Sequence, residues 1–94
     1  MKKSFVLEGG EIQSVDDFYD EVQRVLCPRF KGFGRNWHAF RDILEGGFLE
    51  YEKGEDIDIT IKNSKKMKKQ FPESQFRKII KYCEEASNVT LFLE

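Results

Sequence analysis

Three short apolar segments, far apart in the sequence, constrain the fold of this 94-residue chain most strongly. The first contains Phe5-Val6-Leu7, and the last, Val89–Leu93, is mostly apolar. Between them, Asp56–Lys62 alternates polar and apolar residues, which places its isoleucines on one face of an extended segment. The sequence therefore predicts three β-strands, at Lys3–Leu7, Asp56–Lys62 and Val89–Leu93, with a long connection between each strand and the next.

Helical patterns occupy both connections. Three segments repeat apolar residues every three or four positions, and a fourth is short and basic. Good capping residues precede them, namely Ser14, Asn36 and Ser64 as N-caps and Pro72 in a first turn. We expect helices between Ser14 and Pro28, from Asn36 to about Glu45 before Gly46-Gly47, from Lys65 to Phe71, and from Pro72-Glu73 to the turn at Ala86.

The predicted order is strand, two helices, strand, two helices, strand. Strands joined by helical crossovers favour parallel pairing with right-handed connections. The alternation in Asp56–Lys62 is typical of a strand at a sheet edge, whereas Val89–Leu93 suits the middle of a sheet. The sequence thus predicts an α/β fold, with a three-stranded parallel sheet flanked by helices, in a single domain that spans residues 1–94.

Composition argues against several classes of protein. Hydrophobic residues make up 39% of the chain and the net charge is -1, which favours a folded domain over a disordered one. The apolar stretch after Lys2-Lys3 is too short for a signal peptide, and no stretch is long enough to span a membrane, so we expect a cytoplasmic protein. Cys27, Cys83 and the single His38 match no metal or redox spacing, so we expect no metal ion or cofactor.

Charge is distributed unevenly along the chain. Residues 1–61 carry 13 acidic and 8 basic side chains, and residues 62–94 carry 4 acidic and 8 basic ones. An uneven charge distribution of this kind can steer a charged partner toward one side of a small domain.

Five basic residues lie close together in one segment: Lys62, Lys65, Lys66, Lys68 and Lys69. Such a cluster can bind nucleic-acid phosphates, but no recognised nucleic-acid motif accompanies it, so we favour a solvated basic helix and keep nucleic-acid binding as the alternative function.

Four polar residues share one face of the second helix, because His38, Arg41, Asp42 and Glu45 follow the spacing i, i+3, i+4, i+7. A glycine-bearing loop that contains Phe33 leads into this face. An aromatic, a cation and carboxylates in such a place resemble the anchor residues of a protein interface. The same pattern fits a solvated face stabilised by His38–Asp42 and Arg41–Glu45 pairs, each worth about 0.2–0.5 kcal/mol. The spacing alone leaves both interpretations open.

Catalysis is the third interpretation of this face. His38 with Asp42 or Glu45 could act as an acid–base pair. No nucleophile, oxyanion donor or evident pocket accompanies the pair, and Cys27 has no activating base nearby in the sequence. We therefore expect that the protein is not an enzyme.

The motif Pro28 … Phe33-Gly34-x-Asn36-x-x-Ala39-x-x-Asp42-x-Leu44-x-Gly46 resembles the barstar family of ribonuclease inhibitors. The likeness extends more loosely over the whole chain. It implies a cytoplasmic immunity protein, monomeric when free, that blocks the active site of a small basic ribonuclease or RNase toxin domain. It also implies that the second helix and the loop before it face the enzyme.

The resemblance also implies roles for single residues. Asp42 matches the acid that enters the basic phosphate site of the enzyme. Phe33 matches an aromatic of the loop, and Gly34 and Asn36 match loop-shaping positions. Gly46 matches the glycine at the helix end, near the rim of the interface.

Departures from the family pattern concern its charges. His38 stands where many relatives carry a second acid, and Arg41 stands where an aromatic is common. In the last helix, Lys81-Tyr82 stands where relatives can add an acid. These departures predict a cognate nuclease other than barnase, and a toxin that is not a nuclease stays open as the target.

Overall fold

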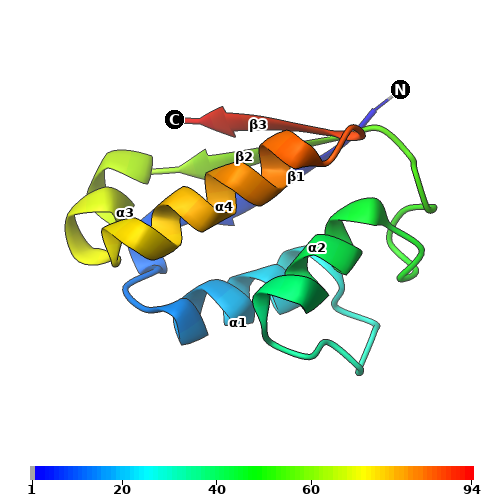
Figure 1. Cartoon of the computed structure of the whole chain (residues 1–94), viewed down its shortest axis with the longest axis horizontal. Helices are drawn as coiled ribbons and strands as arrows, with labels where there is room; N and C mark the ends of the chain where they lie inside the picture. Colours follow the sequence, from blue (N-terminus) through cyan, green and yellow to red (C-terminus); the bar gives the residue numbers. More distant parts are fainter. Residues whose placement is uncertain (1) are drawn as a thin grey trace.

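The structure is a computed structural model and describes residues 2–94. In chain order its elements are β1 (Lys3–Glu8), η1 (Gly9–Glu11), α1 (Val15–Leu26), α2 (Trp37–Glu45), β2 (Ile57–Lys62), α3 (Ser64–Gln70), α4 (Glu73–Glu85) and β3 (Val89–Leu93). All three strands belong to one sheet and pair in parallel. This arrangement confirms the predicted α/β fold with a parallel sheet and helices, which Figure 1 shows.

The predicted order of the strands is wrong. The sheet runs β1-β2-β3, so Asp56–Lys62 supplies the central strand and Val89–Leu93 an edge. The isoleucines of β2 are buried, whereas Thr60 on the other face is only half-buried. Beside Thr60 on that face, Val6 is 44% and Phe92 46% exposed. The alternation therefore reports a sheet with one covered and one open face, which an antiparallel sheet shows more often than a parallel one.

Aromatic rings fix α2 in the core. Phe18 of α1 is fully buried, and its ring centroid lies 5.1 Å from that of Phe40 and 5.8 Å from that of Trp37. Trp37 also stacks on Tyr82 of α4, and its indole N–H donates a hydrogen bond of 3.0 Å to Oε1 of Gln75. Because α2 is attached to both α1 and α4, its outer face is held in a defined orientation.

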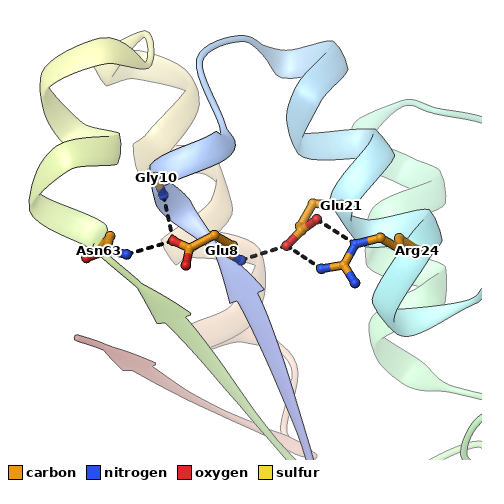
Figure 2. A network of polar contacts seen from close by, with 5 residues as sticks. All are labelled: Glu8, Gly10, Glu21, Arg24 and Asn63. Carbon is orange, nitrogen blue, oxygen red and sulfur yellow. Dashed lines mark hydrogen bonds and ion pairs between the residues drawn. The ribbon is translucent and has the colours of Figure 1, made fainter.

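A polar network closes the end of the sheet where β1 and β2 stop (Figure 2). The backbone N–H of Glu8 donates to Oε2 of Glu21 at 2.7 Å, and Arg24 pairs with the same carboxylate at 2.8 Å. The Glu8 carboxylate accepts from the backbone N–H of Gly10 at 2.9 Å and from Nδ2 of Asn63 at 2.8 Å. These bonds join β1, α1 and the start of α3.

The same network corrects the predicted start of α3. Asn63, and not Ser64, is the N-cap residue, and it has a positive φ of 54°. Its side chain makes no capping bond with the helix. The amide instead donates to Glu8, so a contact with a residue far away in sequence replaces the local cap.

The network predicts a loss of stability in acid. Hydrogen bonds from Asn63 and Gly10 hold the pKa of Glu8 below its ordinary value of 4.5. Burial raises the pKa of Glu21, but hydrogen bonds from Arg24 and from the Glu8 backbone outweigh it and the pKa is lowered. Both carboxylates take up protons more readily in the unfolded chain, so their stabilising effect is present above about pH 4.5 and is lost as pH falls through the lower folded values.

The measurement is the free energy of urea unfolding at pH 7 and at pH 3.5 or below. Wild-type protein is expected to lose more stability between the two than Glu21→Gln, which has no carboxylate to protonate at that position. Equal losses in the two proteins would show that Glu21 does not contribute to the acid sensitivity.

Candidate protein-binding site

The loop before α2 and the first turn of the helix are built around Asn36. Its side chain accepts a hydrogen bond of 2.8 Å from the Ala39 N–H, so it caps α2 as predicted, and its amide donates 3.2 Å to the Gly34 carbonyl. A Cβ on Gly34 would lie 3.3 Å from that amide and 3.4 Å from Ala39 Cβ. The loop therefore packs closely against the start of the helix, with little room for a side chain at Gly34.

Gly46 ends the helix in a conformation that is nearly restricted to glycine. Its φ is 94° and its ψ is -175°, and its N–H donates 3.0 Å to the Ile43 carbonyl. A Cβ there would collide with the Glu52 carbonyl oxygen and lie 2.8 Å from the Tyr51 ring. Gly46 is buried, so it shapes the helix end and offers no side chain to a partner.

The face predicted from helical spacing is solvent-exposed. His38, Arg41, Asp42 and Glu45 are all exposed. Within residues 2–94, none of these four side chains takes part in an ion pair or hydrogen bond, so the pairs His38–Asp42 and Arg41–Glu45 do not form. The charges of Arg41, Asp42 and Glu45 and the imidazole of His38 are therefore available to a partner.

Asp42 borders an apolar hollow of about 230 Å³ between α2 and the neighbouring loops. Its other lining residues are Phe30, Gly32, Phe33, Gly34, Ala39, Ile43 and Phe48. In the free protein water screens the exposed carboxylate, and its interaction with a cation is strengthened once a partner covers the surface and removes that water.

Phe33 is less accessible than the sequence suggested. It is 8% exposed, and its ring packs edge-on against Tyr19 at 5.7 Å. Phe33 thus contributes to the wall of the hollow, and the bulk of its ring lies in the core. Phe30 and Phe48, which the sequence did not single out, pack on each other with ring centroids 4.7 Å apart, and both line the hollow. Both are aromatic residues that lie outside the apolar faces of the helices. This position is the one sequence signal that could have marked them as site residues.

Side-chain bonds hold the two loops of the site together. Arg29 pairs with Glu50 at 2.6 Å and donates 2.6 Å to the Leu49 carbonyl. Gln23 of α1 donates to the Cys27 carbonyl and, at 2.8 Å, to that of Phe30. Both loops are therefore fixed to the body of the protein before any partner binds.

The other candidate groups lie outside this surface. The five lysines from Lys62 to Lys69 are exposed on and beside α3, at the end of the molecule opposite the loop that follows α2 (Figure 1).

Cys27 and Cys83 are free and buried, and burial raises their pKa to about 11 and about 12, so both thiols stay protonated at neutral pH. Among residues 2–94 no cluster of His, Cys, Asp or Glu is suited to a metal ion, and no helix is long and apolar enough to cross a membrane.

Fold and surface together define a small α/β protein that presents one helix and two loops around an apolar hollow. The profile of the family Barstar (barnase inhibitor) matches residues 2–90, and the chain belongs to this family. None of the curated proteins compared with the chain matches it. Members of the family bind ribonucleases and are inhibitors, not enzymes.

Proposed function

We propose that this chain is an immunity protein that acts inside the cell and blocks the active site of a cognate ribonuclease toxin. The observation that carries the proposal is the exposed Asp42 carboxylate, which has no partner within residues 2–94 and lines an apolar hollow. A ribonuclease must bind phosphates, so its active site concentrates cations. A carboxylate on a rigid helix can take the place of a phosphate there.

The energetics favour recognition of that kind of site. Covering Asp42 removes water from its charge, which costs free energy unless every lost hydrogen bond is replaced. Arginine can replace two of them at once, because its guanidinium binds a carboxylate bidentately. A surface without convergent cations leaves the charge unpaired and is rejected.

Rigidity supports the same function. Phe18 and Gln75 hold α2 through Phe40 and Trp37, while Arg29 holds the loop that follows the helix. A surface that is already ordered loses little conformational entropy on binding, which favours tight association.

The basic and polar side chains around Asp42 support a cognate enzyme other than barnase. His38 and Arg41 flank the acid on α2, and Lys78 and Lys81 are exposed on the adjacent α4. Lys78 lies 5.9 Å from the centre of the Trp37 ring, which links the two helices. A fitting partner therefore combines a cationic centre with nearby carboxylates, and a uniformly basic partner surface fits less well.

Electrostatic attraction predicts an association rate that depends on salt. Between about 0.01 M and 1 M ionic strength the Debye length falls from roughly 30 Å to roughly 3 Å, so steering by Asp42 and Glu45 is lost. The association rate constant with the ribonuclease partner is expected to fall steadily over this range, and Glu45→Gln to lower it mainly at low salt. Equal rate constants at both extremes would argue against steering.

Capture of the partner tests the proposal. Immobilised wild-type protein and the matched variants Asp42→Ala and Glu84→Ala are exposed to extract and medium of the source cells, and the bound proteins are identified by mass spectrometry and assayed for RNA cleavage. We expect a ribonuclease bound to wild type and Glu84→Ala but depleted from Asp42→Ala. Equal recovery on Asp42→Ala would contradict the proposal, as would RNA retained by the protein alone with strong salt dependence, which would favour nucleic-acid binding through the lysines of α3.

A further inference from the structure

Leu49 combines two features that are unfavourable in a free protein. Its side chain is 62% exposed, more than any other exposed large apolar residue in the part of the chain that the structure describes. Its backbone has a φ of 87°, in the left-handed region that leucine rarely adopts. Such strain persists only where the surrounding structure imposes it, and it is concentrated at functional sites.

The surrounding structure does impose it. Arg29 donates 2.6 Å to the Leu49 carbonyl and pairs with the side chain of Glu50 at 2.6 Å. On the other side, Lys3 donates 2.9 Å to the Glu50 carbonyl. Two cations from different parts of the chain thus bind two consecutive backbone carbonyls, and these bonds favour the conformation in which the leucine points outward.

Leu49 is linked through its backbone to both loops of the hollow beside Asp42, since Arg29, the neighbour of Phe30, donates to its carbonyl. It follows Phe48, whose ring packs on Phe30 at 4.7 Å and lines the hollow that Asp42 borders. The other exposed large apolar residues, Val6, Phe92 and Leu93, belong to the sheet. Leu49 is therefore the exposed large apolar side chain associated with this site among residues 2–94.

We propose that Leu49 is an apolar anchor of the inhibitory surface, which enters an apolar recess of the ribonuclease beside its phosphate-binding cations. This inference rests on the proposed function and extends the interface from Asp42, past the hollow, to the loop that follows α2. The free-energy cost of the strained Leu49 backbone falls on folding and not on binding. The side chain is therefore already exposed to solvent when the enzyme binds. A few side chains that are packed into pockets with water excluded around them carry most of the affinity of a protein interface.

The test uses substitutions that separate binding from stability. Leu49→Gly and Leu49→Asn remove the apolar side chain, and both residues accept a positive φ more readily than leucine. Affinity for the captured ribonuclease is expected to fall about 10- to 100-fold, mainly through faster dissociation, since burying a leucine is typically worth that much. The Tm is expected to stay unchanged or to rise by a few degrees. The matched control is Leu93→Asn, an exposed leucine of β3 that is expected to leave affinity unchanged.

Asp42→Ala, measured with the same ribonuclease, separates this inference from the proposed function. Loss of affinity in Asp42→Ala with wild-type affinity in both Leu49 variants overturns the anchor and leaves the proposed function standing. Wild-type affinity in all three variants, or the absence of any ribonuclease partner, overturns both. Weaker binding by both Leu49 variants without a lower Tm supports the anchor.

Discussion

Asp42→Ala is expected to weaken binding to the ribonuclease partner by about 2–5 kcal/mol, a tens- to thousands-fold loss of affinity. The physical reason is the effect of the substitution on the cations of the enzyme. Once the carboxylate is removed, the cations of the enzyme that it paired with stay buried without a counter-charge. The loss should appear mainly as faster dissociation, because contacts made in the complex control its lifetime.

Two measurements accompany that experiment. Surface plasmon resonance or an equivalent kinetic method compares wild type, Asp42→Ala and Glu84→Ala, which removes another exposed carboxylate, one that lies beside β3 and outside the hollow. Thermal melting serves as the folding control, and Asp42→Ala should melt close to wild type because the carboxylate is exposed and makes no bond within residues 2–94. Wild-type affinity in a folded Asp42→Ala protein would show that the site is centred elsewhere.

Gly46→Ala is expected to destabilise the protein by about 2–4 kcal/mol, because backbone strain and steric overlap add together. For a domain of this size the Tm should fall by roughly 10–30 °C. The added methyl group would meet the Glu52 carbonyl oxygen and the Tyr51 ring, both of which are part of the folded backbone and core. The neighbouring part of α2 should be displaced, and binding should weaken as a consequence.

Gly47→Ala provides the matched control. Its φ of 93° is nearly the same as the 94° of Gly46, but the nearest atom to an added methyl group would be Lys53 Cβ at 3.7 Å. Gly47→Ala should lose only the stability that backbone strain costs, about 1–2 kcal/mol, so its Tm should be well above that of Gly46→Ala. Equal Tm values for the two variants would show that the crowding around Gly46 relaxes freely.

The helices and strands could be predicted from the sequence because their signals are local. Ser14 and Asn36 cap their helices through their own side chains, and the isoleucines of β2 alternate with polar residues. The order of the strands could not be predicted, because alternation reports which face of a strand is buried and not which strands lie beside it. The N-cap predicted at Ser64 was wrong because the true N-cap, Asn63, makes no local capping bond and instead binds Glu8, 55 residues away in the sequence.

The candidate site also has a part that the sequence predicts and a part that depends on tertiary packing. Helical spacing places His38, Arg41, Asp42 and Glu45 on one face, and the structure shows all four exposed. The hollow arises where the loop around Phe30 meets the loop around Phe48, and no periodicity in the sequence encodes such a meeting of two irregular segments. The burial of Phe33 against Tyr19 depends on the same packing.

RNA cleavage by the captured ribonuclease, titrated with this protein, tests the central claim most directly. We predict that activity falls linearly and disappears at one equivalent of inhibitor, and that a 3′-nucleotide bound at the active site slows the association, because both occupy the same cationic site. Asp42→Ala should require a large excess to inhibit. Cleavage that continues when the ribonuclease is saturated with wild-type protein would contradict the claim that this chain blocks the active site.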